Sequence, residues 1–199
     1  MPPAAATATT ADRAALLDIL ARRSARRGQF TLASGRQSTL YIDARLTTMS
    51  PDGLTLIGPL GLGALRDAGW DVQSVGGLTL GADPVSYAIS YASALAAARG
   101  GPPALRAFTV RKETKAHGTG KLVEGTFERG DRVAVIEDVI TTGGSALRAA
   151  EAVRSAGGTV AGVLALVDRE EGGREALEGA GLAVIALTRA SEIVGRMPA

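Results

Sequence analysis

The sequence contains no cysteine, one histidine, three lysines and no long apolar run. The absence of cysteine excludes disulfide bonds, zinc–thiolate sites and thiol catalysis. No stretch of about 18 residues is apolar without arginine, aspartate or several glycines, which excludes a membrane-spanning helix. A strong excess of one charge is also lacking, because 22 basic and 20 acidic residues leave a formal net charge of +2. The composition therefore gives little support to a nucleic-acid partner.

The composition that is present is typical of a globular protein. The 199 residues are 46% hydrophobic, which suits one domain with a sizeable core and excludes disorder for the bulk of the chain. Residues 1–10 consist of methionine, proline, alanine and threonine, without the basic and apolar segments of a signal peptide. We expect a disordered tail over residues 1–10 and a single domain over residues 11–199.

The placement of the lysines and the histidine is more informative than their number. One ten-residue segment holds all of them: Lys112, Lys115, His117 and Lys121. The rest of the chain uses arginine for positive charge. The segment lies in a polar and glycine-rich stretch, residues 111–125, for which we expect a loop. Loops of this length in compact domains are commonly lids or binding loops, so the segment is a candidate site.

Apolar periodicity predicts that strands and helices alternate along the chain. Helices are expected over residues 12–28, with Gly28 as C-cap, over 51–68, with Ser50 as N-cap and Pro51 first, and over 84–98, 145–156 and 174–180. Strands are expected over residues 30–32, 39–44, 74–76, 107–110, 132–137, 160–168 and 183–187. The strands are continuous apolar runs, which indicates an α/β fold whose parallel sheet is covered on both faces.

Four arginines gather near the end of the first predicted helix: Arg22, Arg23, Arg26 and Arg27. One interpretation is a binding site for polyanions. The interpretation that we favour is a solvated face that complements the helix dipole.

The most informative stretch runs from Val133 to Ser145. An apolar strand ends in two adjacent acids, Glu137 and Asp138, and a turn rich in threonine and glycine then begins a helix. Backbone N–H groups and hydroxyls at a helix N-terminus form a binding site for phosphate, and the two glycines permit close approach. A routine turn with Ser145 as N-cap is the alternative. Adjacent acids at a strand end are costly without a ligand or partner, which favours a site.

The run from Glu137 to Ser145 resembles the phosphoribosyl pyrophosphate signature of type I phosphoribosyltransferases. Three further segments resemble orotate phosphoribosyltransferases within that family. Residues 30–36 resemble the N-terminal hood, residues 111–118 the mobile catalytic loop, and residues 166–169 the base-binding strand end. The similarity extends in order over residues 28–190, and several motifs in one order argue against chance.

The resemblance implies a central, mostly parallel sheet flanked by helices, with a small N-terminal hood mainly from residues 11–45. It implies transfer of the phosphoribosyl group from phosphoribosyl pyrophosphate to orotate, which gives orotidine 5′-monophosphate and pyrophosphate in pyrimidine biosynthesis. The cofactor implied is Mg²⁺, held mainly by the substrate pyrophosphate. The resemblance further implies a cytoplasmic homodimer in which the mobile loop acts across the interface, with no nucleic-acid or membrane partner.

The resemblance also assigns roles to individual residues. The catalytic residues implied are those of the mobile loop: Lys115, His117, Arg111 and Lys112. Phosphoribosyl pyrophosphate is expected to contact Glu137, Asp138, Val139, Ile140, Thr141, Thr142, Gly143, Gly144 and Ser145. The pyrophosphate loop is expected at Thr79, Leu80 and Gly81, and orotate is expected to contact Thr141 and Arg169. Asp83 has two interpretations, a ligand of metal-bound water and, as we prefer, a helix N-cap before Pro84.

Two positions depart from the family pattern, because Leu80 and Ala33 stand where some members have lysine. The pyrophosphate is therefore expected to depend more on backbone N–H groups, Mg²⁺ and the mobile loop. For Arg169 the alternative role is a surface ion pair with Glu170, Glu171 or Asp168. A purine-type phosphoribosyltransferase shares the phosphate signature, although residues 111–118 and Arg169 argue against it. A ligand-sensing regulator on the same fold should carry a basic face for RNA or DNA.

Overall fold

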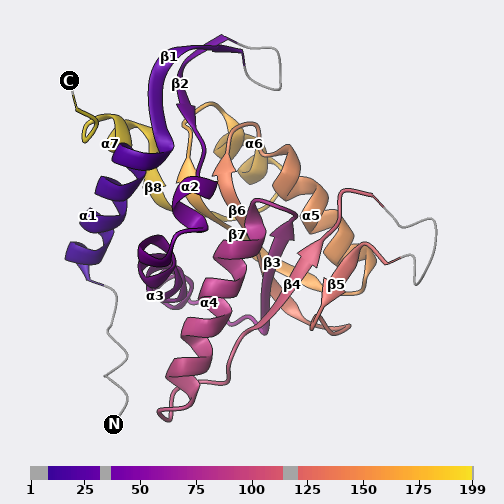
Figure 1. Cartoon of the computed structure of the whole chain (residues 1–199). Coiled ribbons are helices and arrows are strands. Elements are labelled where there is room, and N and C mark those ends of the chain that lie inside the picture. Colours follow the sequence, from indigo (N-terminus) through magenta and orange to yellow (C-terminus); the bar gives the residue numbers. More distant parts are fainter. Residues whose placement is uncertain (1–8, 32–36, 114–120, 199) are drawn as a thin grey trace.

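The structure is a computed structural model that describes residues 9–31, 37–113 and 121–198 (Figure 1). Its central sheet has the strand order β5-β4-β3-β6-β7-β8, and among these strands only the β4–β5 pair is antiparallel. These strands are β3 (Ser74–Leu78), β4 (Arg106–Val110), β5 (Val123–Gly125), β6 (Arg132–Ile140), β7 (Thr159–Asp168) and β8 (Val184–Arg189). A separate antiparallel pair consists of β1 (Ala25–Thr31) and β2 (Gln37–Ile42). The predicted α/β fold with a mostly parallel sheet is confirmed.

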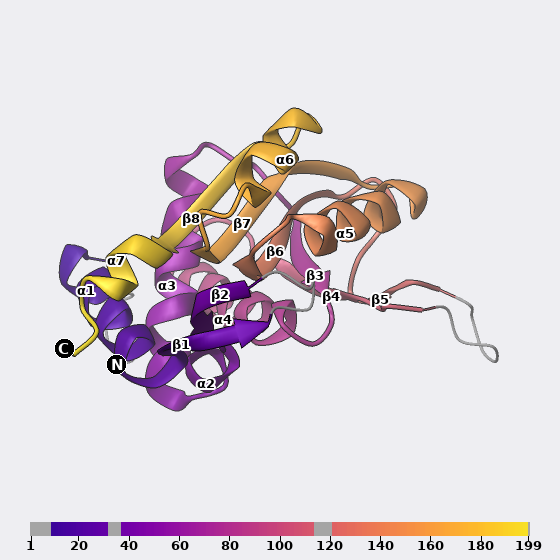
Figure 2. The same ribbon diagram turned by 90° about the horizontal axis from the view of Figure 1, so that it is seen from above.

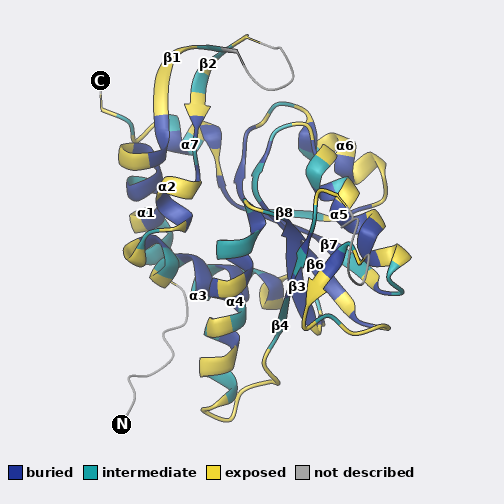
Figure 3. Cartoon of the chain, turned by 45° about the vertical axis from the view of Figure 1, so that its right-hand side comes forward, coloured by how far each residue is buried: buried dark blue, intermediate teal, exposed yellow. Residues whose placement is uncertain are grey.

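Helices cover both faces of the central sheet. The α-helices of the described structure are α1 (Thr10–Ile19), α2 (Arg45–Thr48), α3 (Pro51–Asp67), α4 (Ala82–Ala97), α5 (Gly144–Ser155), α6 (Gly173–Gly179) and α7 (Ala190–Val194). Alternate residues of β6 face opposite sides: Ala134 and Ile136 pack with α1, α3 and α4, whereas Val133 and Val135 pack with α5 and α6. Figure 3 shows the buried strands between helices with exposed outer surfaces. Within the described ranges, no helix has the length and apolar character needed to cross a bilayer.

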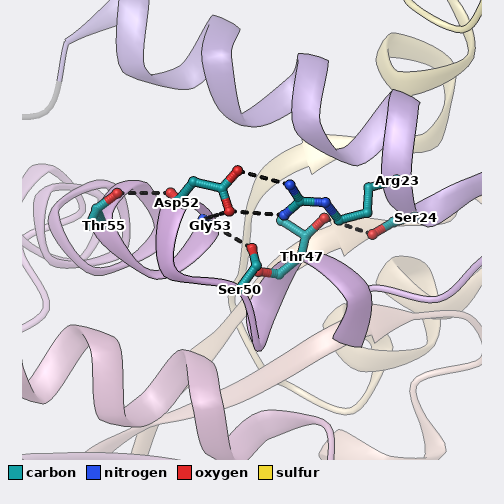
Figure 4. Close-up of polar contacts among 7 residues, drawn as sticks. All are labelled: Arg23, Ser24, Thr47, Ser50, Asp52, Gly53 and Thr55. Carbon is teal, nitrogen blue, oxygen red and sulfur yellow. Dashed lines mark hydrogen bonds and ion pairs between the residues drawn. The ribbon is translucent and has the colours of Figure 1, made fainter.

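The start of α3 follows the prediction. Ser50 is its N-cap, with a hydroxyl that accepts a hydrogen bond from the Gly53 N–H at 3.2 Å, and Pro51 is the first helical residue (Figure 4). Strand β6 is longer than expected, because Val139 and Ile140 continue the ladder with β7. Three short elements, α2, α7 and β5, are absent from the prediction, since elements of three to five residues show no clear periodicity.

The first helix differs from the prediction at both ends. It begins at Thr10, with Thr9 as its N-cap, and residues 1–8 of the expected tail lie outside the described residues. It continues into a π-helical segment, η1 (Leu20–Ser24), and the chain then enters β1. Gly28 is therefore not a C-cap but a strand residue, because β1 pairs with β2 along this stretch.

The arginine cluster is divided between two elements. Arg22 and Arg23 lie in the last turn of η1, as the dipole interpretation expects, but Arg26 and Arg27 lie on β1. Arg23 also forms a two-pronged ion pair with Asp52 of α3, at 2.9 and 3.0 Å (Figure 4). This ion pair connects η1 to the first turn of α3.

Strands β1 and β2 form the hood predicted from the resemblance. In Figure 1 this hairpin lies above the central sheet, at the end toward which β3 and β4 point. Arg169, the residue after β7, donates hydrogen bonds to Ser38 Oγ at 3.1 Å and to the Leu40 carbonyl at 2.9 Å, both on β2. The hood therefore lies at the carboxyl edge of the sheet. The turn predicted at residues 33–36 lies outside the described residues.

Two glycines allow β3 to lie close to both of its neighbours. A Cβ atom at Gly77 would lie 1.9 Å from the Ile136 carbonyl oxygen of β6, and one at Gly76 would lie 2.2 Å from the Phe108 carbonyl oxygen of β4. Real Cβ atoms do not approach carbonyl oxygens this closely, so any side chain here must displace a neighbouring strand.

Gly77→Ala is therefore expected to lower the free energy of unfolding by about 1–3 kcal/mol, measured by urea denaturation followed by circular dichroism. Gly179→Ala is the matched control, because a Cβ at the end of α6 would meet no atom within 4 Å. The control should leave stability unchanged or raise it by up to about 1 kcal/mol, because alanine favours the helix more than glycine does. Equal stability of the two variants would contradict the close approach of β3 to β6.

Candidate active site

The candidate site lies where the strand order of the sheet reverses. From β3 the chain continues to β4 on one side, and the later strands β6, β7 and β8 follow on the other. The segments after the neighbouring strands β3 and β6 therefore diverge from one point of the carboxyl edge. Open parallel sheets bind ligands at such a switch point. The two segments are residues 79–81 and residues 141–145, both of which the resemblance assigns to ligand binding.

Two acids at the end of β6 lie in a costly environment. Only 7% of Glu137 is exposed. Burial, followed by the neighbouring charge of Asp138, raises the pKa of Glu137 well above its ordinary value. Burial also raises the pKa of Asp138, although a hydrogen bond from the Val139 N–H at 2.9 Å and the charge of Arg45 oppose this shift. Neither acid forms an ion pair with a residue that the structure describes, so both are suited to accept hydrogen bonds from hydroxyls of a ligand.

The turn after β6 leaves the N-terminus of α5 open. Gly143 is the N-cap, with φ of 80°, and no side chain caps the helix. The alternative of a routine turn capped by Ser145 is therefore wrong. A Cβ at Gly143 would lie 2.9 Å from the Gly173 carbonyl oxygen, so both the positive φ and the close packing select glycine. The first N–H groups of α5 carry no side-chain cap and can bind an anion.

The loop after β3 contacts one of the two acids. A Cβ at Gly81 would lie 2.5 Å from Asp138 Oδ2, so only glycine lets the loop approach this carboxylate. The Thr79 N–H donates to the Val110 carbonyl at 2.8 Å, and the Thr79–Leu80 peptide bond is cis. The Leu80 side chain is 55% exposed. The structure thus brings the predicted pyrophosphate loop beside the predicted ribose-binding acids.

Asp83 is not the N-cap of α4. The helix begins at Ala82, and its N-cap is Gly81, which provides no side-chain cap. The Asp83 carboxylate instead accepts hydrogen bonds from the hydroxyls of Thr79 and Thr109, at 2.7 and 2.8 Å. The prediction of Asp83 as N-cap is therefore wrong, because its carboxylate binds the preceding loop and β4 instead of the N–H groups of α4.

Arg169 is buried rather than on the surface. Its Nη2 donates to Glu171 Oε1 at 2.6 Å as well as to the hood. Of the three acids named for the alternative role, only Glu171 pairs with Arg169 in the described structure, and the pair is buried; Asp168 pairs with Arg174 and Glu170 accepts from the Ser191 N–H. Arg169 Nε and Glu171 Oε2 are buried without a hydrogen-bond partner in the described parts of the chain. Unsatisfied charged groups beside the carboxyl edge are typical of a ligand site.

The predicted catalytic loop is described only at its ends. Lys115 and His117 lie outside the described residues. Arg111 follows β4 and pairs with Glu124 at 3.2 Å, and Lys112 is exposed. Figure 2 shows that the β4–β5 hairpin extends away from the rest of the sheet. Strand β3 lies between β4 and β6 in the sheet. Arg111 and Lys112, which follow β4, therefore do not contact Glu137 at the end of β6.

Two charged residues at this edge were missed by the sequence analysis. Asp43 and Arg45 form a two-pronged ion pair at 2.9 and 3.0 Å just after β2. Together with Leu46, Met49 and Leu80 they line a hollow of about 450 Å³. Arg45 lies close enough to Asp138 to lower the pKa of that carboxyl. The only sequence signal is an acid and an arginine directly after a strand, which is weak without the fold.

Known proteins share both the sequence and the fold of this chain. An orotate phosphoribosyltransferase of Bradyrhizobium sp. (strain ORS 278) is 46% identical over 189 residues, which are 93% of this chain and 98% of that protein. The crystal structure of Mycobacterium tuberculosis orotate phosphoribosyltransferase in complex with Fe(III) dicitrate is 43% identical, with a TM-score of 0.77, and covers 92% of this chain and 98% of its own.

The structure of the same M. tuberculosis enzyme in complex with 5-phospho-alpha-D-ribosyl 1-diphosphate has a TM-score of 0.74 and 40% identity, and covers 92% of this chain and 99% of its own. No protein-family model matches the chain. The identity and the near-complete coverage nonetheless decide its membership. The chain belongs to the orotate phosphoribosyltransferases.

Proposed function

We propose that the protein transfers the phosphoribosyl group of phosphoribosyl pyrophosphate to orotate, giving orotidine 5′-monophosphate and pyrophosphate. The reaction is a step of de novo pyrimidine biosynthesis, and we place it in the cytoplasm. The observation that carries the proposal is the junction of β3 and β6, where a glycine loop, two buried acids and an uncapped helix N-terminus meet. A relative of the same family has been crystallised with the sugar substrate, which agrees with this reading.

The sugar phosphate is proposed to lie across the turn after β6. Glu137 and Asp138 accept hydrogen bonds from the ribose hydroxyls, which offsets the cost of their burial. The 5′-phosphate binds the turn, through backbone N–H groups and hydroxyls at the N-terminus of α5. The residues concerned are Glu137, Asp138, Val139, Ile140, Thr141, Thr142, Gly143, Gly144 and Ser145.

The pyrophosphate is proposed to lie against Thr79, Leu80 and Gly81. The bond from C1 of the ribose to pyrophosphate oxygen breaks while the orotate nitrogen attacks, and negative charge accumulates on the leaving group. Cations near that group lower the barrier. We assign this task to Arg111, Lys112, Lys115 and His117, whose closure also excludes water. Arg45, in the same hollow as Leu80, adds a cation where some relatives have lysine.

Mg²⁺ is the cofactor that membership of this family implies. The edge of the sheet offers carboxylate, hydroxyl and carbonyl oxygens, which Mg²⁺ prefers. No group of three or more histidine, aspartate or glutamate side chains gathers for a metal within the described ranges. We therefore propose that substrate oxygens and water hold most of the ion, whose charge helps to neutralise the leaving pyrophosphate. The interpretation of Asp83 as a ligand of metal-bound water stays a prediction.

Orotate is proposed to contact Arg169 and Thr141. The guanidinium lies at the carboxyl end of β7, where the Arg169 N–H donates to the Ile140 carbonyl at 3.0 Å. A planar guanidinium binds a carboxylate through two parallel hydrogen bonds. Arg169 Nη2 already donates a hydrogen bond to the Glu171 carboxylate. Orotate must therefore share the guanidinium with Glu171 or displace the Glu171 carboxylate from it.

The active form is proposed to be a homodimer whose mobile loop reaches the neighbouring site. The described structure offers an apolar surface on α3 and α4, where Leu54, Pro59, Tyr87, Tyr91 and Leu95 line a groove of about 460 Å³. The two tyrosines and Leu95 are exposed. Because Tyr87 contacts Thr109 of β4, a second copy on this surface would lie near the strand that leads into the loop.

The base-specificity assay tests the reaction directly. The purified protein with Mg²⁺ and phosphoribosyl pyrophosphate is expected to consume orotate and to release pyrophosphate, both measured over time. Adenine, xanthine and uracil serve as competing bases and should not be used. Turnover of one of these bases without turnover of orotate would refute the assignment.

Glu137→Gln is expected to stabilise the ligand-free protein at alkaline pH while impairing catalysis. Because the pKa of Glu137 is raised from 4.5 on folding, the stability linked to its proton is complete below about pH 4.5. That stability is lost as the pH rises through the folded pKa, and glutamine removes the loss. Thermal unfolding at pH 8 should show a higher Tm, and kcat/KM for phosphoribosyl pyrophosphate should fall about 100-fold.

Glu151→Gln is the control for this variant, because Glu151 is an exposed residue on α5. It should change neither the Tm at pH 8 nor the kinetics. A Tm of Glu137→Gln that stays below that of the wild type across the alkaline range would show that the buried acid is not a cost to the ligand-free fold.

Hybrid dimers test whether the loop acts across the interface. Lys115→Ala and Asp138→Asn are each expected to be nearly inactive, the first with binding of phosphoribosyl pyrophosphate partly retained. If the loop acts in trans, a hybrid dimer has one site with an intact loop and intact acids. Subunits exchanged at equal amounts should then recover about a quarter of the wild-type activity. Activity no higher than the sum of the two variants would refute action in trans.

A further inference from the structure

A network of side-chain hydrogen bonds joins the loop at residues 79–81 to α4 and β4. Its centre is Asp83, a half-buried residue in the first turn of α4. The Thr79 hydroxyl donates to Asp83 Oδ2 at 2.7 Å, and the Thr109 hydroxyl donates to Asp83 Oδ1 at 2.8 Å. Each carboxylate oxygen thus holds a hydroxyl from a different element.

The hydrogen bonds of the network run in one direction. A threonine hydroxyl has a single proton, and Thr109 uses it for Asp83. The Tyr87 hydroxyl, 3.0 Å from Thr109 Oγ1, must therefore donate to Thr109. Tyr87 orients the Thr109 hydroxyl, Thr109 orients the Asp83 carboxylate, and the carboxylate fixes Thr79. Three elements are connected through hydroxyl and carboxylate groups alone.

The network ends at the loop on which the proposed reaction depends. Thr79 is held from two sides, by Asp83 and by the hydrogen bond of its N–H to the Val110 carbonyl. Two residues later Gly81 packs against the Asp138 carboxylate. Between them Leu80 has no charged group with which to hold an anion. The positions of the N–H groups of Leu80 and Gly81 therefore contribute to how well an anion binds here.

We propose that Asp83 is a positioning residue that sets the backbone of residues 79–81 to receive the diphosphate group of the sugar substrate, with Thr109 and Tyr87 orienting its carboxylate. The inference rests on the proposed function. Helix capping does not account for Asp83, because both of its oxygens accept from hydroxyls of other segments and α4 has no side-chain cap. Small displacements of groups that bind a reacting substrate cost large factors in rate.

The test compares Asp83→Ala, Thr109→Val and Tyr87→Phe in steady-state kinetics, with phosphoribosyl pyrophosphate and orotate varied separately. The KM for phosphoribosyl pyrophosphate is expected to rise about tenfold in Asp83→Ala and about threefold in Thr109→Val, with a smaller rise in Tyr87→Phe. The KM for orotate should stay unchanged in all three. Binding of inorganic pyrophosphate, measured by titration calorimetry, should weaken in the same order.

Thr126→Val is the matched control, because among the described residues the Thr126 hydroxyl makes one hydrogen bond of 2.9 Å, to the Ala107 carbonyl, and none to residues 79–81. Parallel changes in both KM values, or unchanged pyrophosphate binding in Asp83→Ala and Thr109→Val, would overturn the inference. If Asp83→Ala does not fold, Thr109→Val, which keeps the shape of the side chain, decides it. If the wild-type protein does not turn over orotate, the proposed function is refuted. The titrations with inorganic pyrophosphate then still test whether Asp83 positions the loop.

Discussion

The site depends on the close contact between β3 and β6. These strands lie side by side because Gly77 presents only hydrogen to the Ile136 carbonyl. The contact places the ends of the two strands at one point, so that Gly81 meets Asp138 and the turn after β6 faces the loop after β3. The residues proposed to bind the ribose, the 5′-phosphate and the pyrophosphate are brought together by that contact. A larger residue in β3 would separate the two halves of the site as well as weaken the core.

The same contact places two acids in an environment that destabilises the ligand-free protein. Glu137 is buried, Asp138 lies beside it, and the nearest cationic influence on Asp138 is the charge of Arg45, which is itself paired with Asp43. A fold selected for stability alone would place apolar residues here. Under the proposed function, the hydroxyls of the ribose offset this cost, and binding of the sugar phosphate stabilises the folded state. The buried acids thus lower the stability of the ligand-free protein at the same place where they are proposed to bind the ribose.

The sequence predicted those parts of the molecule that local patterns encode. The run from Val133 to Ser145 predicted a buried strand, two acids at its end and a glycine turn that begins a helix, because strand burial and turn chemistry are local properties. Gly28 failed as a cap because pairing with β2 overrode a helical pattern, and Asp83 failed as a cap because hydroxyls from two other segments bind its carboxylate. Arg45 was missed since a helix of four residues has no period to detect. The fold class was accessible from pattern, whereas contacts between distant segments were not.

Arg169 connects the N-terminal hood to the segment that follows β7. One guanidinium nitrogen holds the Leu40 carbonyl of the hood, 129 residues away in sequence, and the Glu171 carboxylate beside β7. Under the proposed assignment, orotate bound to this guanidinium changes the contacts that hold the hood. Thermodynamic linkage then requires the reverse: whatever fixes or releases the hood changes the affinity for the base by the same factor. Under the proposed assignment of Arg169, the affinity for the base is therefore coupled to the contacts that hold β2 against the end of β7.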